Sequence, residues 1–297
     1  MNSTGVQSNF WSSKKRTERI TKIAVWLILV LGSVTMLLPI FWMFSTALKT
    51  EATVFATPPI WIPLHPLWKN FVDAWNIDGI YKSQGVNFTT YTINTIIISV
   101  SNAIGVMISS AVVAYAFARL RFPGRDVLFL LCLATLMIPY QVTMIPTFIL
   151  FRNLGWYNTY YPLIVPAFLG GGAFNIFLVR QFFMTIPYEL DEAGKIDGCS
   201  HLGIFYRILL PLCKPALATV GVFSFVYNWN DFLNPLIYIN SNSKYTLTLG
   251  LTNFVSFYGQ QYNLLMAASL VISIPVIIIF LIGNQYFIRG IATTGFK

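Results

Sequence analysis

The chain has 297 residues, of which 56% are hydrophobic and only 10% are charged, and its mean hydropathy is +0.66. Soluble domains carry about 25% charged residues, so the composition excludes an ordinary soluble protein and indicates a surface that faces lipid. The net charge of +9 does not point to nucleic acid, because the basic residues gather at the ends of apolar segments. Three isolated cysteines, without a C-x-x-C pair or a histidine at metal spacing, predict no metal site.

The first apolar segment follows a basic tail. Five lysines and arginines between positions 14 and 22 precede an apolar run from Ile23 to about Leu48. The run is too long for the apolar part of a cleaved secretory signal, and no small-x-small cleavage site follows it. We predict a cytoplasmic tail over residues 1–22 and a first membrane span immediately after it.

Apolar segments long enough to cross a membrane, which takes roughly 20 residues, recur along the rest of the chain. The predicted spans are 23–48, 89–118, 126–151, 160–186, 208–236 and 263–288. The fourth holds three successive glycines at 170–172, and the fifth begins with Pro211 and Pro215. Because neighbouring protein must satisfy the backbone groups that such residues free, we expect both spans inside a bundle. The predicted fold is an all-α, six-span membrane domain over residues 23–297.

The distribution of lysine and arginine sets the orientation, because cytoplasmic loops carry the excess. With the N-terminus inside, five basic residues lie in the tail, three at 119–125, four between 180 and 214 and two near the C-terminus, against five outside. Both termini are therefore predicted in the cytoplasm. Outside, the proline- and tryptophan-rich segment 49–88 is either an interfacial segment or a simple connector, and segment 237–262 forms a second loop.

The predicted spans contain no group that could couple transport to an ion gradient. Their central parts hold no Asp, Glu, Lys, Arg or His, whereas ion-coupled carriers place such groups within the membrane. The chain also lacks a phosphate-binding G-x-x-x-x-G-K-[ST] loop, a Ser-His-Asp set and paired catalytic carboxylates. We expect a protein that is not an enzyme, and transport against a gradient would need energy from a partner.

The cytoplasmic loop over residues 187–205 has the start and stop signals of a short helix. Pro187 suits a first helical position, and the acidic side chains at 189, 191 and 192 would complement the helix dipole in the opening turns. Gly198 can end the helix in the left-handed conformation, and Ser200 can cap the helix that follows. The loop is therefore predicted to hold a short helix.

This helix would be amphipathic. Leu190, Ala193 and Ile196 or Asp197 follow one another at three- to four-residue spacing and so share a face. On helix physics alone, two interpretations fit equally well: a helix that docks onto a partner protein, and a linker that lies on the membrane surface.

A spaced pattern in the same loop favours the first interpretation. The residues are Glu192, Ala193, Gly194, Gly198, Ile208, Leu210 and Pro211. With these gaps the loop resembles the cytoplasmic loop of ABC-importer permeases, E-A-A-x3-G-x9-I-x-L-P, at six of seven defined positions. Gly194 replaces the second alanine, which loosens the helix by up to about 1 kcal/mol. The resemblance implies a coupling helix that fits a cleft in an ATPase subunit, through Glu192, Ala193, Gly194, Asp197 and Gly198.

The resemblance covers nearly the whole chain and is to the maltose-type branch of carbohydrate ABC permeases. The strings that carry it are Pro58-Pro59-x-Trp61-x-Pro63 with Asn70-Phe71, residues 137–146 (MIPYQVTMIP), Leu154-Gly155 with Asn158-Thr159, residues 229–232 (WNDF) and residues 286–290 (YFIRG). It implies a second, homologous permease subunit, two ATPase subunits and an extracytoplasmic sugar-binding protein, assembled in a bacterial cytoplasmic membrane. No cofactor is expected in this chain, since ATP and Mg²⁺ would bind to the ATPases.

A sugar pathway needs hydroxyl partners and aromatic faces, which polar side chains within the spans can supply. The candidates are Gln141, Tyr227, Asn228, Asn230 and Asp231. Gln141 lies between two prolines that predict a kinked third span. Packing is the competing interpretation, because buried amides also join helices; for Trp229 we favour packing. Asn94 and Asn102 in the second span are weaker candidates.

The leading hypothesis is a non-catalytic permease that works by alternating access and carries a sugar or oligosaccharide. The same architecture with another cargo, such as a glycerophosphodiester or a polyamine, is the alternative. A secondary carrier is disfavoured by the uncharged spans. A membrane-embedded transferase is disfavoured because acidic residues cluster only in the 187–205 loop.

Overall fold

The computed structural model describes residues 7–76, 88–256 and 260–292, and every regular element within these ranges is helical. The principal helices are α1 (Gln7–Ala47), α4 (Phe88–Arg119), α8 (Ala173–Thr185), α12 (Lys214–Trp229) and α16 (Tyr262–Ala292). The other elements are η1 (Glu51–Thr53), α2 (Lys69–Trp75), α5 (Arg125–Ala134), η2 (Thr135–Met137), α6 (Tyr140–Asn153), α7 (Tyr161–Ile164), η3 (Val165–Phe168), α9 (Glu189–Ile196), α10 (His201–Ile204), η4 (Phe205–Leu209), α11 (Leu210–Leu212), α13 (Leu233–Tyr238), η5 (Asn242–Lys244), α14 (Leu247–Gly250) and α15 (Asn253–Ser256). The predicted all-α fold is confirmed.

The described residues contain four helices long and apolar enough to cross a membrane, or six if each of two bent pairs is one span. These six segments match the six predicted spans in order. The fourth span joins α7, η3 and α8, and the second and sixth are α4 and α16.

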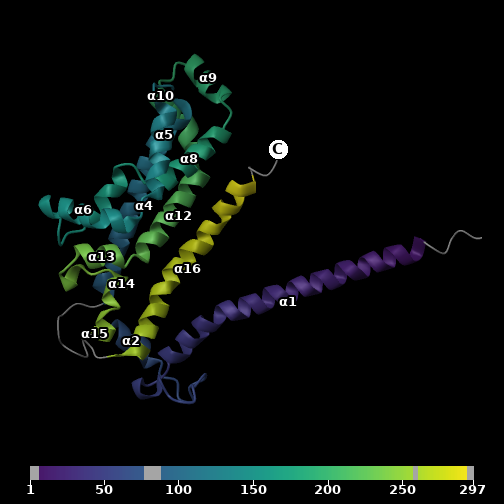
Figure 1. Ribbon diagram of the computed structural model, residues 1–297, viewed down its shortest axis with the longest axis vertical. Helices are drawn as coiled ribbons and strands as arrows, with labels where there is room; N and C mark the ends of the chain where they lie inside the picture. Colours follow the sequence, from purple (N-terminus) through teal and green to yellow (C-terminus); the bar gives the residue numbers. More distant parts are fainter. Residues whose placement is uncertain (1–6, 77–87, 257–259, 293–297) are drawn as a thin grey trace, which may run out of the picture.

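Helix α1 stands apart from the other helices (Figure 1). None of the apolar window within Thr17–Ala47 is buried, and only the last turn, Ser45 to Ala47, reaches the bundle and becomes buried. The helix begins at Gln7, well before the predicted span, and residues 1–6 lie outside the described part of the chain. Lysine and arginine are good helix formers, so the helix runs without a break from the basic segment at 14–22 into the apolar run.

Helix α4 lies at the centre of the bundle, between α8 and α12. Its side chains bond to backbone carbonyls of the fourth span: Asn102 Nδ2 donates to Leu163 O at 2.8 Å, and Ser109 Oγ to Ala167 O at 2.7 Å. A Cβ on Gly171 would lie 2.9 Å from the backbone N of Ser110, and the φ of Gly171 is +70°. Only glycine allows this close approach. The three glycines therefore let the chain turn from η3 into α8 while it stays in contact with α4.

Two predicted spans are broken rather than continuous. In the third, α5 and η2 meet α6 at 99°. The break falls at Ile138, whose extended backbone (ψ 115°) is the conformation that a following proline favours. Pro146 lies inside α6 and does not break it. The predicted kink in the third span is therefore confirmed, and it falls at Pro139.

The fifth predicted span, 208–236, begins inside the first arm of a bent pair of helices and ends beyond the second arm. The segment His201–Leu212 meets α12 at 75°, and α12 covers only Lys214–Trp229 before the separate helix α13. Pro215 explains the break, because proline lacks the N–H that would continue the preceding helix. Both α8 and α12 pack against α4, which confirms that the fourth and fifth spans lie inside the bundle.

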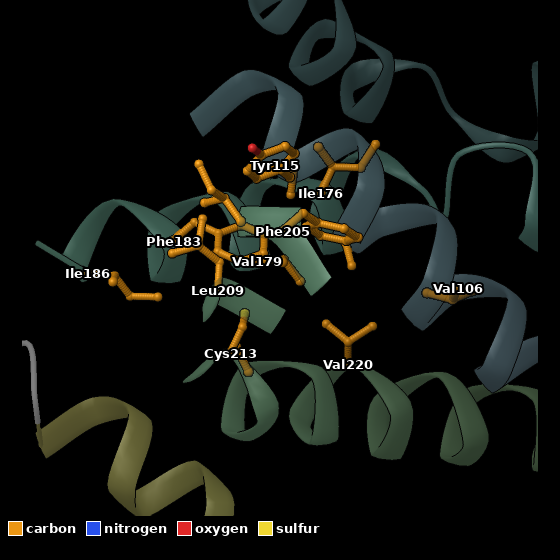
Figure 2. Close-up of a cluster of buried hydrophobic side chains, with 14 of the residues drawn as sticks. Val106, Tyr115, Ile176, Val179, Phe183, Ile186, Phe205, Leu209, Cys213 and Val220 are labelled. Carbon is orange, nitrogen blue, oxygen red and sulfur yellow. The ribbon is translucent and has the colours of Figure 1, made fainter. Parts of the chain in front are cut away.

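A buried apolar cluster joins α4, α8 and the segment from α10 to α12. It contains Tyr115, Val179, Phe183, Phe205 and Leu209 among others (Figure 2). The Tyr115 and Phe205 ring centroids are 4.9 Å apart. This cluster forms the base on which the 187–205 loop lies.

The predicted coupling loop and parts of the two predicted outer segments lie at opposite ends of the bundle. Helices α9 and α10 lie at one end, and α2 and α15 lie at the other (Figure 1). This separation agrees with the orientation deduced from the basic residues. Segment 77–87 and residues 257–259 of the predicted outer loops lie outside the described ranges.

Candidate functional site

The predicted helix in the 187–205 loop is α9, Glu189–Ile196. It begins two residues later than expected, since Pro187 precedes its N-cap, Tyr188. The three acidic residues fall in its first turn, as predicted. Gly198 adopts a φ of +79° and ends the helix, and Ser200 Oγ accepts a hydrogen bond from Gly203 N at 3.2 Å to cap α10. Both of these predictions are confirmed.

The outer face of α9 points away from the bundle and carries apolar side chains next to charged ones. Ile196 is 86% exposed and Leu190 is 39% exposed, and Ala193 and Asp197 are exposed as well. The face that the sequence pattern predicted is therefore formed, and within this chain nothing in the described residues covers it. Glu192 is exposed beside it. Of the predicted coupling residues, Gly194 alone turns inward.

Gly194 lets α9 lie close to the helix that follows. A Cβ at this position would lie 2.8 Å from Cδ1 of Ile208 and 3.2 Å from Cγ1 of Ile204. Those contacts are tighter than ordinary packing, so an alanine there would force Ile208 to move. Glycine in place of the second alanine of the E-A-A pattern therefore fits the short distance between α9 and η4.

The other inward residue of α9, Asp191, contacts α4. Its Oδ2 lies 3.5 Å from Nε of Arg119, and the two side chains are 4% and 6% exposed. Neither of these two atoms has a hydrogen-bond partner in the described part of the chain, so the contact is one of charge. Arg119 Nη2 also donates to Ile186 O at 2.7 Å. Burial raises the pKa of the Asp191 carboxyl, although Arg119 and Lys195 oppose the shift.

The five predicted pathway residues do not form one cluster. Gln141, Tyr227 and Asn230 are exposed, Tyr227 by 68%. Asn228 is buried and donates to Ser224 O of its own helix at 2.7 Å. Whether any of them contacts a transported molecule stays a prediction. Trp229 is buried, and its indole N–H donates to Ile272 O of α16 at 3.1 Å, which is the geometry of packing.

Asp231 belongs to a polar network that the sequence did not reveal. Its carboxylate accepts from the backbone N of Asn234 at 3.2 Å and from Asn234 Nδ2 at 2.8 Å. Tyr140, the first residue of α6, donates from its hydroxyl to Asn234 Oδ1 at 2.6 Å. The network thus joins the break in the third span to the start of α13. The three-residue spacing of Asp231 and Asn234, typical of a helix cap, was the available signal.

The sequence of the chain matches the pattern of binding-protein-dependent transport system inner membrane components over residues 107–293. The chain belongs to this family. The resemblance to ABC-importer permeases is thereby confirmed, as is the inner-membrane location. The protein is the membrane component of a transport system that works with a binding protein.

Named relatives extend over most of the chain. It is 34% identical over 287 residues to the probable ABC transporter permease protein YurM of Bacillus subtilis, covering 95% of this chain and 91% of the relative. It is 37% identical over 222 residues to the arabinooligosaccharides transport system permease protein AraQ of Halalkalibacterium halodurans, covering 75% of this chain and 78% of the relative. It is 34% identical over 267 residues to the sn-glycerol-3-phosphate transport system permease protein UgpE of Yersinia pestis, covering 89% of this chain and 94% of the relative.

A solved structure shares the fold. It is the crystal structure of a bacterial ABC transporter involved in the import of the acidic polysaccharide alginate. The TM-score is 0.78 at 26% sequence identity, and the match covers 92% of this chain and 98% of the solved one.

Proposed function

We propose that this permease forms half of the translocation pathway of an ATP-driven importer for a sugar or oligosaccharide, and that α9 is the coupling helix. The observation that carries the proposal is the division of α9 into two faces. Asp191 and Gly194 bind it to the bundle, while Leu190, Ala193 and Ile196 are presented outward. An exposed apolar face on an anchored helix is suited to a partner's groove.

The partner best suited to this helix is an ATPase subunit. The chain has no nucleotide-binding loop of its own, so ATP and Mg²⁺ would bind to two such subunits outside it. Glu189 and Glu192 beside the apolar face would favour a groove with basic residues at its rim. ATP-driven closure of the two subunits would then displace α9.

The exposed apolar surfaces of α1 and α6 support a second, homologous permease subunit. Large side chains such as Trp26 (68% exposed), Met36 (77%) and Ile145 (62%) need cover from lipid or protein. Two permease subunits would enclose a pathway between them, to which an extracytoplasmic binding protein delivers the cargo.

The relative whose name includes arabinooligosaccharides supports a carbohydrate as the cargo. Uncharged polar and aromatic side chains near the end of α12, Tyr227 and Asn230, suit hydroxyl groups and sugar faces. A glycerol phosphate is the second candidate, because another relative carries that compound in its name at 34% identity. The two cargoes differ in charge and can be separated by direct binding.

The experiment is ATP-dependent uptake by the complete complex in liposomes. Arabinotriose, maltotriose and sn-glycerol-3-phosphate are first tested for thermal stabilisation of the partner binding protein, and a stabilising compound is then used radiolabelled. We expect uptake of a carbohydrate with ATP and none with a non-hydrolysable analogue. Uptake that continues when the ATPases carry an inactivating substitution would refute ATP coupling, and stabilisation by glycerol phosphate alone would refute the carbohydrate cargo.

A further inference from the structure

The cytoplasmic end of α4 holds the coupling loop on both sides of α9. Before the helix, Arg119 Nη2 donates to Ile186 O at 2.7 Å, and within it the same guanidinium lies 3.5 Å from Asp191. After the helix, the Tyr115 hydroxyl donates to His201 O at 2.9 Å. These contacts come from the second span, although the loop joins the fourth and fifth spans in the sequence.

The charge contact is not explained by stability. Both side chains of the Arg119–Asp191 pair are almost fully buried, and the loss of water around two buried charges commonly offsets their attraction. Burial raises the pKa of the Asp191 carboxyl, and the nearby charge of Arg119 opposes that shift. A buried pair of this kind can fix the position of α9 without adding to the stability of the fold.

The opposite end of α4 holds the outer loop by a different set of bonds. Asn94 Nδ2 donates to Ser243 O at 2.9 Å and to Tyr245 O at 3.0 Å. Thr95 Oγ1 accepts from Leu247 N at 2.9 Å. One helix therefore contacts the coupling loop at its cytoplasmic end and segment 243–247 at its outer end.

We propose that Arg119 is a positioning residue that fixes α9 to α4, and that α4 carries the displacement of α9 to the outer segment. Helix α4 has 32 residues and so spans about 48 Å at 1.5 Å per residue, longer than the roughly 30 Å core of a bilayer. It is continuous, unlike the spans on either side of the coupling loop. The inference rests on the proposed function, since an ATPase must move α9.

The test places a fluorescent amino acid at Ser243, which is exposed, and follows its emission in the purified complex when ATP is added. Co-purification of the ATPase subunits is measured on the same samples. The variants are R119M, R119K and the apolar double variant R119M/D191L. R121M is the matched control, because it removes an exposed arginine two residues further along.

We expect ATP to change the emission of the unaltered complex and of R121M. R119M should bind the ATPases normally but lose most of the signal, by about fivefold or more, the lower range of site-to-site coupling. R119K should keep part of it, since it retains the charge without the planar donors. The double variant buries no charge and should be stable, yet its signal should stay low.

Several outcomes would overturn the inference. An R119M or double-variant signal equal to that of the unaltered complex shows that α4 does not depend on the pair. Failure of the double variant to bind the ATPases places the pair in docking rather than in transmission. Absence of an ATP signal in the unaltered complex, with uptake intact, removes α4 as the carrier. Failure of the unaltered chain to bind ATPases would instead refute the proposed function.

Discussion

At its outer end α4 holds the neighbouring loop with uncharged side chains, whereas at its cytoplasmic end it adds a buried pair of charges to its hydrogen bonds to Ile186 O and His201 O. Asn94 and Thr95 bond to the backbone of segment 243–247, and Asn158 joins a second loop to the same region through Asn240 N at 3.1 Å. Bonds of this kind fix a loop in one place. Arg119 and Asp191 instead attract each other through their charges at 3.5 Å. This attraction does not require one particular angle between the two groups.

The difference indicates separate tasks for the two ends. Hydrogen bonds to backbone groups weaken steeply with angle and distance, so the outer loops are held rigidly. The cytoplasmic end has bonds of the same kind before and after α9, but α9 itself is held by a charge contact. Such a contact persists over a wider range of positions, so it keeps α9 attached to α4 while α9 is displaced. We therefore expect substitutions at the outer end to change stability and those at the cytoplasmic end to change coupling.

The largest effect is expected at the exposed face of α9. Replacing Ile196 by Ser leaves the fold unchanged, because the side chain is 86% exposed. If Ile196 is buried against an ATPase, its loss costs about 1.5–3 kcal/mol, which is measured as weaker co-purification and lower uptake. Leu202→Ser on α10, 69% exposed in this chain, is the matched control. Equal loss in both variants would contradict a specific role for α9.

A pair of glycines compares the two ends directly. Gly198, after α9, and Gly155, in an outer loop, have φ of +79° and +73°, and a Cβ would meet nothing within 4 Å at either. Valine at each position carries the same backbone cost of roughly 1–2 kcal/mol. We expect Gly198→Val to slow uptake by about fivefold to thirtyfold and Gly155→Val to lower only the melting temperature. Similar uptake by the two variants would remove the distinction.

At the outer end, Asn158→Ala should reduce stability without uncoupling. The side chain accepts from Asn240 N and Ser241 N and donates to Ser241 Oγ at 2.8 Å. Loss of these bonds lowers the free energy of unfolding by about 1 kcal/mol, measured as the melting temperature in detergent. The ratio of solute carried to ATP hydrolysed should not change. A lower ratio at unchanged stability would contradict the account.

The smallest expected effect is a pH dependence of stability. The charged groups that face the Asp191 carboxyl are Arg119 on α4, Lys195 on α9 and His201 on α10, and Tyr115 lies beside it on α4. Because burial raises the pKa of Asp191, the folded protein takes up a proton more readily than the unfolded chain. The contribution of Asp191 to stability is therefore full below its unfolded pKa and is lost as pH rises through the raised pKa.

The measurement compares the unaltered protein with D191N. The melting temperature of the unaltered protein, relative to that of D191N, should increase as the pH is lowered from 7 toward the ordinary aspartate pKa of 3.8. A difference that is constant with pH, or that decreases on acidification, would show that the carboxyl has no raised pKa.

The local features of the coupling loop could be predicted from the sequence. Gly198 and Ser200 are a helix stop and a helix cap whose geometry depends on residues within three positions, and both are formed. The order and number of the apolar segments, and the place of the glycine-containing fourth span inside the bundle, also follow from composition and residue type.

The contacts between distant segments could not be predicted in this way. Arg119 was expected only as an orientation signal, since nothing in the sequence shows that Asp191 lies beside it. The network of Tyr140, Asn234 and Asp231 forms because the third span breaks at Pro139 rather than at Pro146, and two prolines in one apolar segment do not reveal which of them interrupts the helix.

The most direct test of the central claim uses a photo-crosslinking amino acid in place of Ala193, on the exposed face of α9. The complete complex is irradiated in native membranes, and the products are identified by mass spectrometry. We expect one principal product that links this chain to an ATP-binding subunit from the cytoplasmic side. A crosslink to lipid alone, or labelling of position 193 by a reagent that cannot cross the membrane, would contradict the assignment of α9 as the coupling helix.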